Sequence, residues 1–100
     1  MEPGKPDICI SDVVASTAGR DSGQLFYVIG TDGVYAELVN GKDRSLEKPK
    51  HKKIKHVRKV LRSETRVAAK IRSGDKVLNS ELRRDLAYFS QTGNSHNQGG

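Results

Sequence analysis

Five large apolar residues follow one another from Leu25 to Ile29 in the stretch QLFYVIG. Most of them are aromatic or β-branched, which favours a β-strand. Because the apolar side chains do not alternate with polar ones, we expect a strand that is buried on both faces or that crosses a barrel. Only 34% of the 100 residues are hydrophobic, and tryptophan is absent. We therefore predict one small core, in a barrel or in a small sheet with a helix on it.

Further short strands are expected on both sides of this run. The stretch ICISDVVAS supplies Ile8, Ile10, Val13 and Val14 to a first strand, in which Asp12 marks either a bulge or the true start. Thr-Asp-Gly at 31–33 and Asn-Gly at 40–41 are typical of tight turns, and they flank a third strand over 34–39. Residues 54–61 fit either a helical stripe or a strand, and we favour a strand over 56–60. The pattern predicts a meander of short strands.

The last third of the chain has the pattern of two short helices that dock on the barrel or on each other. In the first, Ser63 is the candidate N-cap and Gly74 is placed to end the helix. In the second, Asn79 or Ser80 is the candidate cap, and Gly93 lies beyond the end. The apolar faces are formed by Val67, Ala68 and Ile71, and by Leu82, Leu86 and Phe89. We divide the chain into a flexible lead-in at 1–7, a barrel with a basic strand and loop at 8–62, a helical segment at 63–92 and a disordered tail at 93–100.

Several function classes are disfavoured by what the chain contains. Its single cysteine, Cys9, excludes a disulfide framework and a cysteine zinc cluster, and we expect it to be a small buried residue of a protein from a reducing compartment. No positioning motif surrounds the serine, histidine and aspartate residues, so we expect no catalytic residue, no enzyme activity and no cofactor. The histidines lie among lysines, which disfavours a metal site. No apolar run is long enough to cross a bilayer, and we expect a cytoplasmic monomer with no membrane partner.

The positive charge is concentrated in one part of the chain. The whole chain has a net charge of +6, yet the segment from Lys42 to Arg62 holds ten Lys and Arg residues and only two acidic ones. Such a segment attracts polyanions when it is folded onto one face. Lys48-Pro49-Lys50 indicates an extended backbone that presents the following lysines along a line. Because lysines outnumber arginines and aromatic residues are few, recognition of structured RNA through its phosphates and shape fits better than base stacking.

A polar turn separates the first two expected strands. Gly19 and Gly23 bracket Arg20, Asp21 and Ser22 in the stretch VVASTAGRDSGQLFYVIG. Two glycines permit positive φ and a close approach of another backbone, although they could equally serve only to shape the turn. The spacing excludes a Walker loop, because no Gly-Lys-Ser/Thr follows and the next element is a strand.

This stretch resembles the KOW motif, a strand, a glycine-bearing loop and a strand. Its continuation, DGVYAELVNGKDRSLEKPKHKKIKH, looks like that of bacterial KOW-domain proteins similar to large-subunit ribosomal proteins of the archaeal and eukaryotic kind. The resemblance covers about residues 8–60 and is carried by Val14, Ser16, Ala18, Gly19, Arg20, Asp21 and Gly23, by Gly41, Lys42 and Arg44, and by Lys48, Pro49, Lys50, Lys52 and His56. It implies a mainly β, SH3-like barrel that binds RNA, often ribosomal RNA, in translation or ribosome assembly. Asp43, between Lys42 and Arg44, departs from the pattern.

From these observations we expect an RNA-binding protein of the translation machinery, associated with the ribosome. Its partners would be ribosomal RNA and large-subunit ribosomal proteins. The expected RNA contacts are Ser16, Gly19, Arg20, Asp21, Gly23, Lys42, Arg44, Lys48, Lys50, His51, Lys52, Lys53, Lys55, His56 and Arg58. Asp21 would orient Arg20 or cap the loop. The alternative is a protein-interaction module, a KOW-type barrel that contacts a ribosomal or transcription protein.

Overall fold

Five antiparallel strands and two helices make up the fold of the computed structural model, which describes residues 8–99, with side chains described as far as Gln91. The strands are β1 (Asp12–Ser16), β2 (Leu25–Thr31), β3 (Tyr35–Val39), β4 (Lys50–Lys53) and β5 (Val57–Arg62). A short 3-10 helix, η1 (Ile54–His56), joins β4 to β5, and α1 (Arg66–Ser73) and α2 (Asn79–Gly99) follow. The predicted mainly β class is confirmed, whereas the predicted lead-in at 1–7 lies outside the described residues.

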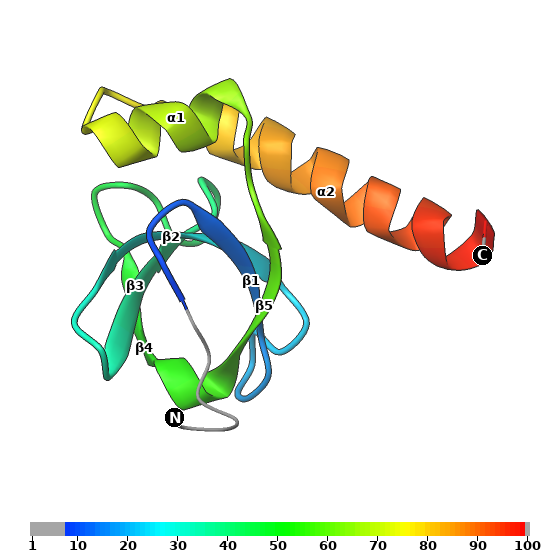
Figure 1. Cartoon of the computed structure of the whole chain (residues 1–100). Coiled ribbons are helices and arrows are strands. Elements are labelled where there is room, and N and C mark those ends of the chain that lie inside the picture. Colours follow the sequence, from blue (N-terminus) through cyan, green and yellow to red (C-terminus); the bar gives the residue numbers. More distant parts are fainter. Residues whose placement is uncertain (1–7, 100) are drawn as a thin grey trace.

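The strands form one curved sheet in the order β4-β3-β2-β1-β5. β1 lies between β2 and β5, so the first strand of the sheet pairs with the last. Figure 1 shows that the strands curl around a common interior, that η1 closes one end and that both helices lie at the opposite end. This arrangement is compatible with a small β-barrel.

The apolar run at 25–29 belongs to two cores, which explains its lack of alternation. Phe26 and Val28 point to one face of the sheet, where they join a buried cluster with Val14, Ala36, Leu38 and Val57. Tyr27 points to the other face, where Leu82 and Leu86 of α2 and Val67 and Ala68 of α1 cover it. The prediction of a strand buried on both faces is therefore confirmed.

Neither helix uses a predicted residue as its N-cap, and Asn79 and Ser80 lie inside α2. Thr65 is the N-cap of α1, and its side chain accepts a hydrogen bond from the Ala68 N–H at 3.2 Å. The hydroxyl of Ser63 is instead buried against that of Tyr27, 2.8 Å away. At α2 the Glu81 carboxylate accepts the Leu78 N–H at 3.0 Å, while the Asn79 side chain accepts the Leu46 N–H. The predicted caps Ser63, Asn79 and Ser80 are thus wrong, because tertiary partners take the Ser63 and Asn79 side chains and Glu81 caps α2.

The predicted end of the first helix is confirmed, whereas that of the second is wrong. Gly74 ends α1 in a left-handed conformation, as predicted, with φ of +80°. The second helix does not end before Gly93 but continues to Gly99, through the segment predicted as a disordered tail. A single interior glycine costs a helix only about 1 kcal/mol relative to alanine, which does not by itself stop it.

Cys9 is exposed, which contradicts the expected burial between two isoleucines. The chain turns before β1: the Asp12 N–H donates to the Cys9 carbonyl at 3.1 Å, and Ser11 has a φ of +72°. The Asp12 carboxylate accepts the Cys9 N–H at 2.8 Å. The first strand therefore starts at Asp12, one of the two predicted possibilities, and Ile8 and Cys9 precede it.

A buried hydroxyl joins the sheet to both helices. The Tyr27 hydroxyl lies 2.8 Å from the Ser63 Oγ and 3.3 Å from the Thr65 Oγ1, and it donates to the Asp85 carboxylate at 2.7 Å. Burial, together with hydrogen bonding to Asp85, raises the pKa of Tyr27 to about 12, so the phenol is neutral and acts as donor.

Replacement of Tyr27 by phenylalanine is expected to lower the free energy of unfolding by about 1–3 kcal/mol, because it removes a buried donor and leaves Asp85 short of a partner. Urea unfolding followed by circular dichroism measures the change. The matched control is Tyr35→Phe, since 41% of Tyr35 is exposed. An equal loss in both variants would contradict the role of the Tyr27 hydroxyl.

Candidate functional site

The four residues of β4 alternate between two surfaces. In the register with β3, Lys50 lies opposite Leu38 and Lys52 opposite Ala36, on the inner face. His51 lies opposite Glu37 and Lys53 opposite Tyr35, on the outer face. The predicted line of lysines is therefore split, and its members have different surroundings.

The two inward lysines hold the β1–β2 loop, residues 17–24. The Lys52 Nζ donates to the Ala18 carbonyl at 2.7 Å and lies 3.1 Å from the Asp21 carboxylate. The Lys50 Nζ lies 3.3 Å from the same carboxylate. Only 10% of the Lys52 side chain is exposed. Lys52 is thus bound within the protein, and reversal of its charge would place an acid beside Asp21.

Asp21 is the centre of this loop. The Ser16 hydroxyl donates to it at 2.7 Å, and Ser16 is itself buried. Burial alone would raise the pKa of Asp21, but the hydrogen bonds from Ser16, Lys52 and Lys50, together with the charge of Lys50, lower it to about 2. The Asp21 carboxylate therefore pairs with the lysines of β4 and not with Arg20. Ser16 and Asp21 shape the loop.

Asp21 and its partners Ser16, Lys50 and Lys52 form what we call the Asp21 cluster. The cluster predicts a stability that depends on pH, and substitution of Asp21 removes this dependence. Because its pKa falls from 3.8 to about 2 on folding, Asp21 stabilises the fold above pH 4, and this contribution is lost as the pH falls toward 2. Urea unfolding of wild-type and Asp21→Asn proteins should give a difference in unfolding free energy that narrows from pH 5 down to about pH 2. A constant difference would contradict the ion pairs.

Four cations surround the same end of the barrel, and none of them forms an ion pair or side-chain hydrogen bond with another described residue. Arg20 lies on the β1–β2 loop, Lys53 ends β4, Lys55 belongs to η1, and Arg58 is near the start of β5, and all four are exposed. The Thr17 N–H donates to the His56 carbonyl at 2.9 Å, so the loop and η1 are in contact. We call this region the basic end: residues 17–24, β4, η1, Val57 and Arg58.

Both glycines of the β1–β2 loop adopt a left-handed backbone conformation that favours glycine. Gly19 and Gly23 have φ of +89° and +91°, which side-chain-bearing residues rarely adopt. A Cβ on Gly19 would lie 3.4 Å from the Lys52 Nζ, whereas one on Gly23 would meet nothing within 4 Å. The need to shape the turn is therefore sufficient to explain Gly23. At Gly19 a side chain would in addition come close to the Lys52 Nζ.

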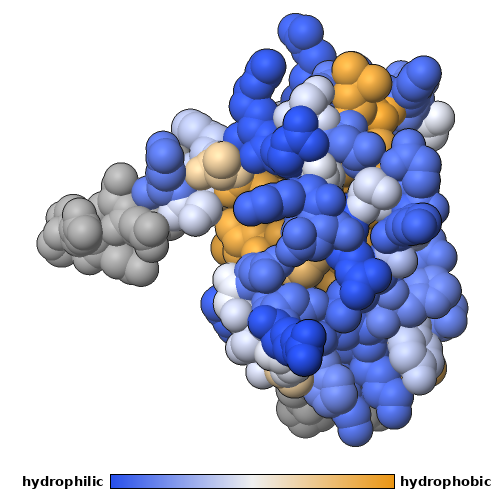
Figure 2. Space-filling model, turned by 180° about the vertical axis from the view of Figure 1, so that it is seen from behind, coloured by the Kyte–Doolittle hydropathy of each residue, from blue (hydrophilic) through white to orange (hydrophobic). Residues whose placement is uncertain are grey.

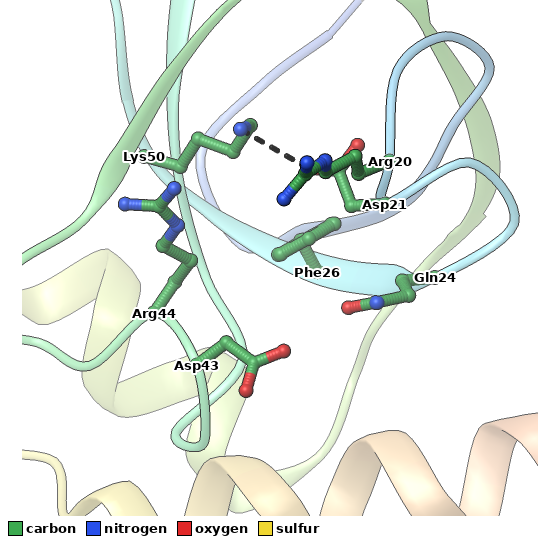
Figure 3. A pocket seen from close by; sticks show the side chains of 7 residues that line it. All are labelled: Arg20, Asp21, Gln24, Phe26, Asp43, Arg44 and Lys50. Atoms are coloured by element: carbon green, nitrogen blue, oxygen red, sulfur yellow. Dashed lines mark ion pairs between the residues drawn. The ribbon is translucent and has the colours of Figure 1, made fainter.

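A pocket of about 220 Å³ opens at the mouth of the barrel, between the β1–β2 loop and the segment 40–49. Figure 3 shows Arg20, Arg44 and Lys50 around it, with Phe26 at its base. Asp43 and Gln24 complete the lining. The lining therefore carries three cations and two carboxylates, and Lys50 is already paired with Asp21.

The remaining predicted residues lie around this region. Lys42 is exposed on the turn that follows Asn40, and Lys48 is exposed two residues before β4. His51 is on the outer face, where its Nε2 lies 2.7 Å from the Glu37 carboxylate. His56 is half-buried in η1. Within residues 8–91, no group of three or more His, Cys, Asp and Glu side chains is placed to hold a metal ion.

Sequence reasoning missed four residues of the site. Gln24, Phe26 and Asp43 line the mouth pocket, and Tyr35 is exposed directly opposite Lys53. The apolar run 25–29 predicts burial of Phe26, and the structure places it both in the core and at the base of the mouth pocket, near the start of β2. The alternation of β3 was the available signal for Tyr35, since it places Tyr35 opposite in direction to Ala36 and Leu38.

Comparison with known proteins does not identify a family for this chain. No protein-family model matches the chain, and no curated protein matches it at a significant level. The class that the fold and the site define is a small antiparallel β protein with two helices and a cationic end. In the part of the chain that the structure describes, no helix is long and apolar enough to span a membrane.

Proposed function

We propose that this chain is an RNA-binding protein of the translation machinery and that it contacts ribosomal RNA with its basic end. On this proposal the sheet is an SH3-like barrel of the KOW type. The observation that carries it is the convergence of Arg20, Lys53, Lys55 and Arg58 on one end of the barrel, none of them paired with another described residue. Unpaired cations from separate elements are free to neutralise phosphates.

The internal pairs support the same proposal. Lys50 and Lys52 neutralise Asp21, so the β1–β2 loop presents little net negative charge to a polyanion. They also fix the loop, and a fixed loop loses less conformational entropy on binding. The exposed ring of Tyr35 next to Lys53 offers one surface on which a base can stack.

Sedimentation tests the proposal directly. The tagged protein is run on sucrose gradients with bacterial ribosomal subunits at low and high salt, and its affinity for purified bacterial ribosomal RNA is measured by filter binding. We expect migration with the large subunit, and a log–log salt slope of about −0.7 to −0.9 for each phosphate contacted. An affinity insensitive to salt, or a protein that stays at the top of every gradient, would reject the proposal and favour the protein-interaction alternative.

A further inference from the structure

We propose that a groove between α2 and the mouth of the barrel binds an unpaired segment, a bulge or a loop, of the RNA. This inference rests on the proposed function. It extends the interface from the basic end onto α2, and it assigns Lys42 and Arg83 as phosphate contacts there.

The groove begins as a hollow of about 450 Å³ between the helix and the sheet. Leu86, Ala87 and Arg83 line it from α2, and Gln24, Leu25 and Lys42 line it from the barrel side. Figure 2 shows hydrophobic side chains gathered where α2 leaves the barrel, with hydrophilic ones around them. The hollow therefore combines an apolar base with cationic edges.

This hollow adjoins the mouth pocket. Gln24 lines both, and the turn 42–44 lies between them, with Lys42 on the α2 side and Asp43 and Arg44 on the mouth side. In Figure 3, α2 passes below Gln24 and Asp43. Five cations thus follow one path from the β1–β2 loop to α2, namely Arg20, Lys50, Arg44, Lys42 and Arg83. Two carboxylates face the same path, Asp21 and Asp43, and the first is already paired with lysines.

The wall that α2 forms is held in place before any ligand arrives. The Arg83 Nη1 donates to the Gly41 carbonyl at 2.6 Å, and the Asn79 side chain accepts the Leu46 N–H at 2.9 Å. These contacts fix the helix on segment 40–49. The guanidinium of Arg83 has five N–H donors, so those not used by Gly41 remain for a phosphate.

The shape of the groove selects the form of the RNA. A double helix is much larger than a hollow of about 450 Å³, and it meets a protein through its backbone and shallow groove. An unpaired strand separates its phosphates from its bases, so the phosphates reach the cationic edges while the bases lie over Leu25 and Leu86. Unpaired bulges and loops are also the parts of folded RNA that proteins most often distinguish.

Two hairpin RNAs and two variants of α2 test this inference. The probes are a labelled hairpin with an unpaired internal bulge and a fully paired hairpin of the same length. Ala87→Glu places a carboxylate in the groove without removing a hydrogen bond, and Arg84→Ala makes the same change in net charge at an exposed position of α2 that does not line the groove. We expect Ala87→Glu to weaken binding of the bulged hairpin about tenfold and that of the paired hairpin less than about twofold, and Arg84→Ala to affect both slightly and equally.

Crosslinking gives a second readout that does not depend on affinity. A photoreactive group is attached to Ala87→Cys in a Cys9→Ser background, since Cys9 is exposed and would also react. Crosslinks to the bulge nucleotides support the inference. If wild-type protein binds both hairpins but Ala87→Glu behaves like Arg84→Ala, or if the crosslinks fall in the paired stem, the groove is not the site and the proposed function stands. If wild-type protein binds neither the two hairpins nor purified ribosomal RNA, both proposals fail.

Discussion

Simultaneous replacement of Lys53, Lys55 and Arg58 by glutamate will weaken binding to ribosomal RNA about a hundredfold and reduce the salt slope by about two to three. These three side chains are exposed, and none forms an ion pair with another described residue. Their reversal therefore removes phosphate contacts and adds repulsion while it leaves the Asp21 cluster intact. Filter binding at several salt concentrations measures both quantities, and circular dichroism checks that the fold persists.

The matched control reverses three cations elsewhere. Arg66, Lys76 and Arg84 are exposed on α1, on the connection between the helices and on α2. Their replacement by glutamate changes the net charge by the same amount, so a general charge effect would weaken binding equally in both variants. Equal weakening would contradict a localised interface. Lys50 and Lys52 are left unchanged, because their reversal would disrupt the contact with Asp21.

Replacement of Gly41 by alanine is expected to cost about 3–5 kcal/mol of unfolding free energy, a larger loss than removal of the Tyr27 hydroxyl causes. Gly41 has a φ of +75° and packs against the first turn of α2. A Cβ at this position would overlap the Asn79 carbonyl oxygen and approach Leu82 to 3.0 Å. Leu82 belongs to the buried core and the Asn79 side chain accepts the Leu46 N–H, so α2 would have to shift. Thermal unfolding and urea unfolding measure the loss.

Gly33→Ala separates backbone strain from this close contact. Gly33 has a φ of +93°, but a Cβ there meets nothing within 4 Å. Only the strain of the left-handed conformation remains, which costs about 1–2 kcal/mol. Comparable losses in both variants would contradict the packing of Gly41 against α2.

Local signals were sufficient for β2, for β3 and for the turn between them. The consecutive apolar residues 25–29 indicated burial on both faces, and Asp32 and Gly33 marked the turn between β2 and β3. In the structure the Asp32 carboxylate accepts the N–H groups of Val34 and Tyr35, a contact between near neighbours in sequence. Features of this kind depend on few residues, and sequence reasoning reaches them.

Contacts between distant residues were not accessible in the same way. The sequence identified Asp21, Lys50 and Lys52 but not their mutual contact, because the residues lie about thirty positions apart and only the barrel brings them together. Serine is a residue type that favours N-caps, yet the Ser63 hydroxyl is hydrogen-bonded to the buried Tyr27 hydroxyl. The groove along α2 depends on where the helix docks. Tertiary placement decided each of these features.

The pairing of the first strand with the last sets the order in which the chain can acquire its fold during synthesis. β1 is an interior strand, but one of its edges has no partner until residues 57–62 have been made. The carboxylate of Asp21 likewise lacks its lysine partners until Lys50 and Lys52 have been made. A nascent chain that stops before Arg62 therefore exposes an unpaired strand and an uncompensated acid, and non-local pairing of this kind slows folding. The sheet can be completed only after residues 57–62 have been made, and the two helices that pack over Tyr27 follow them in the chain.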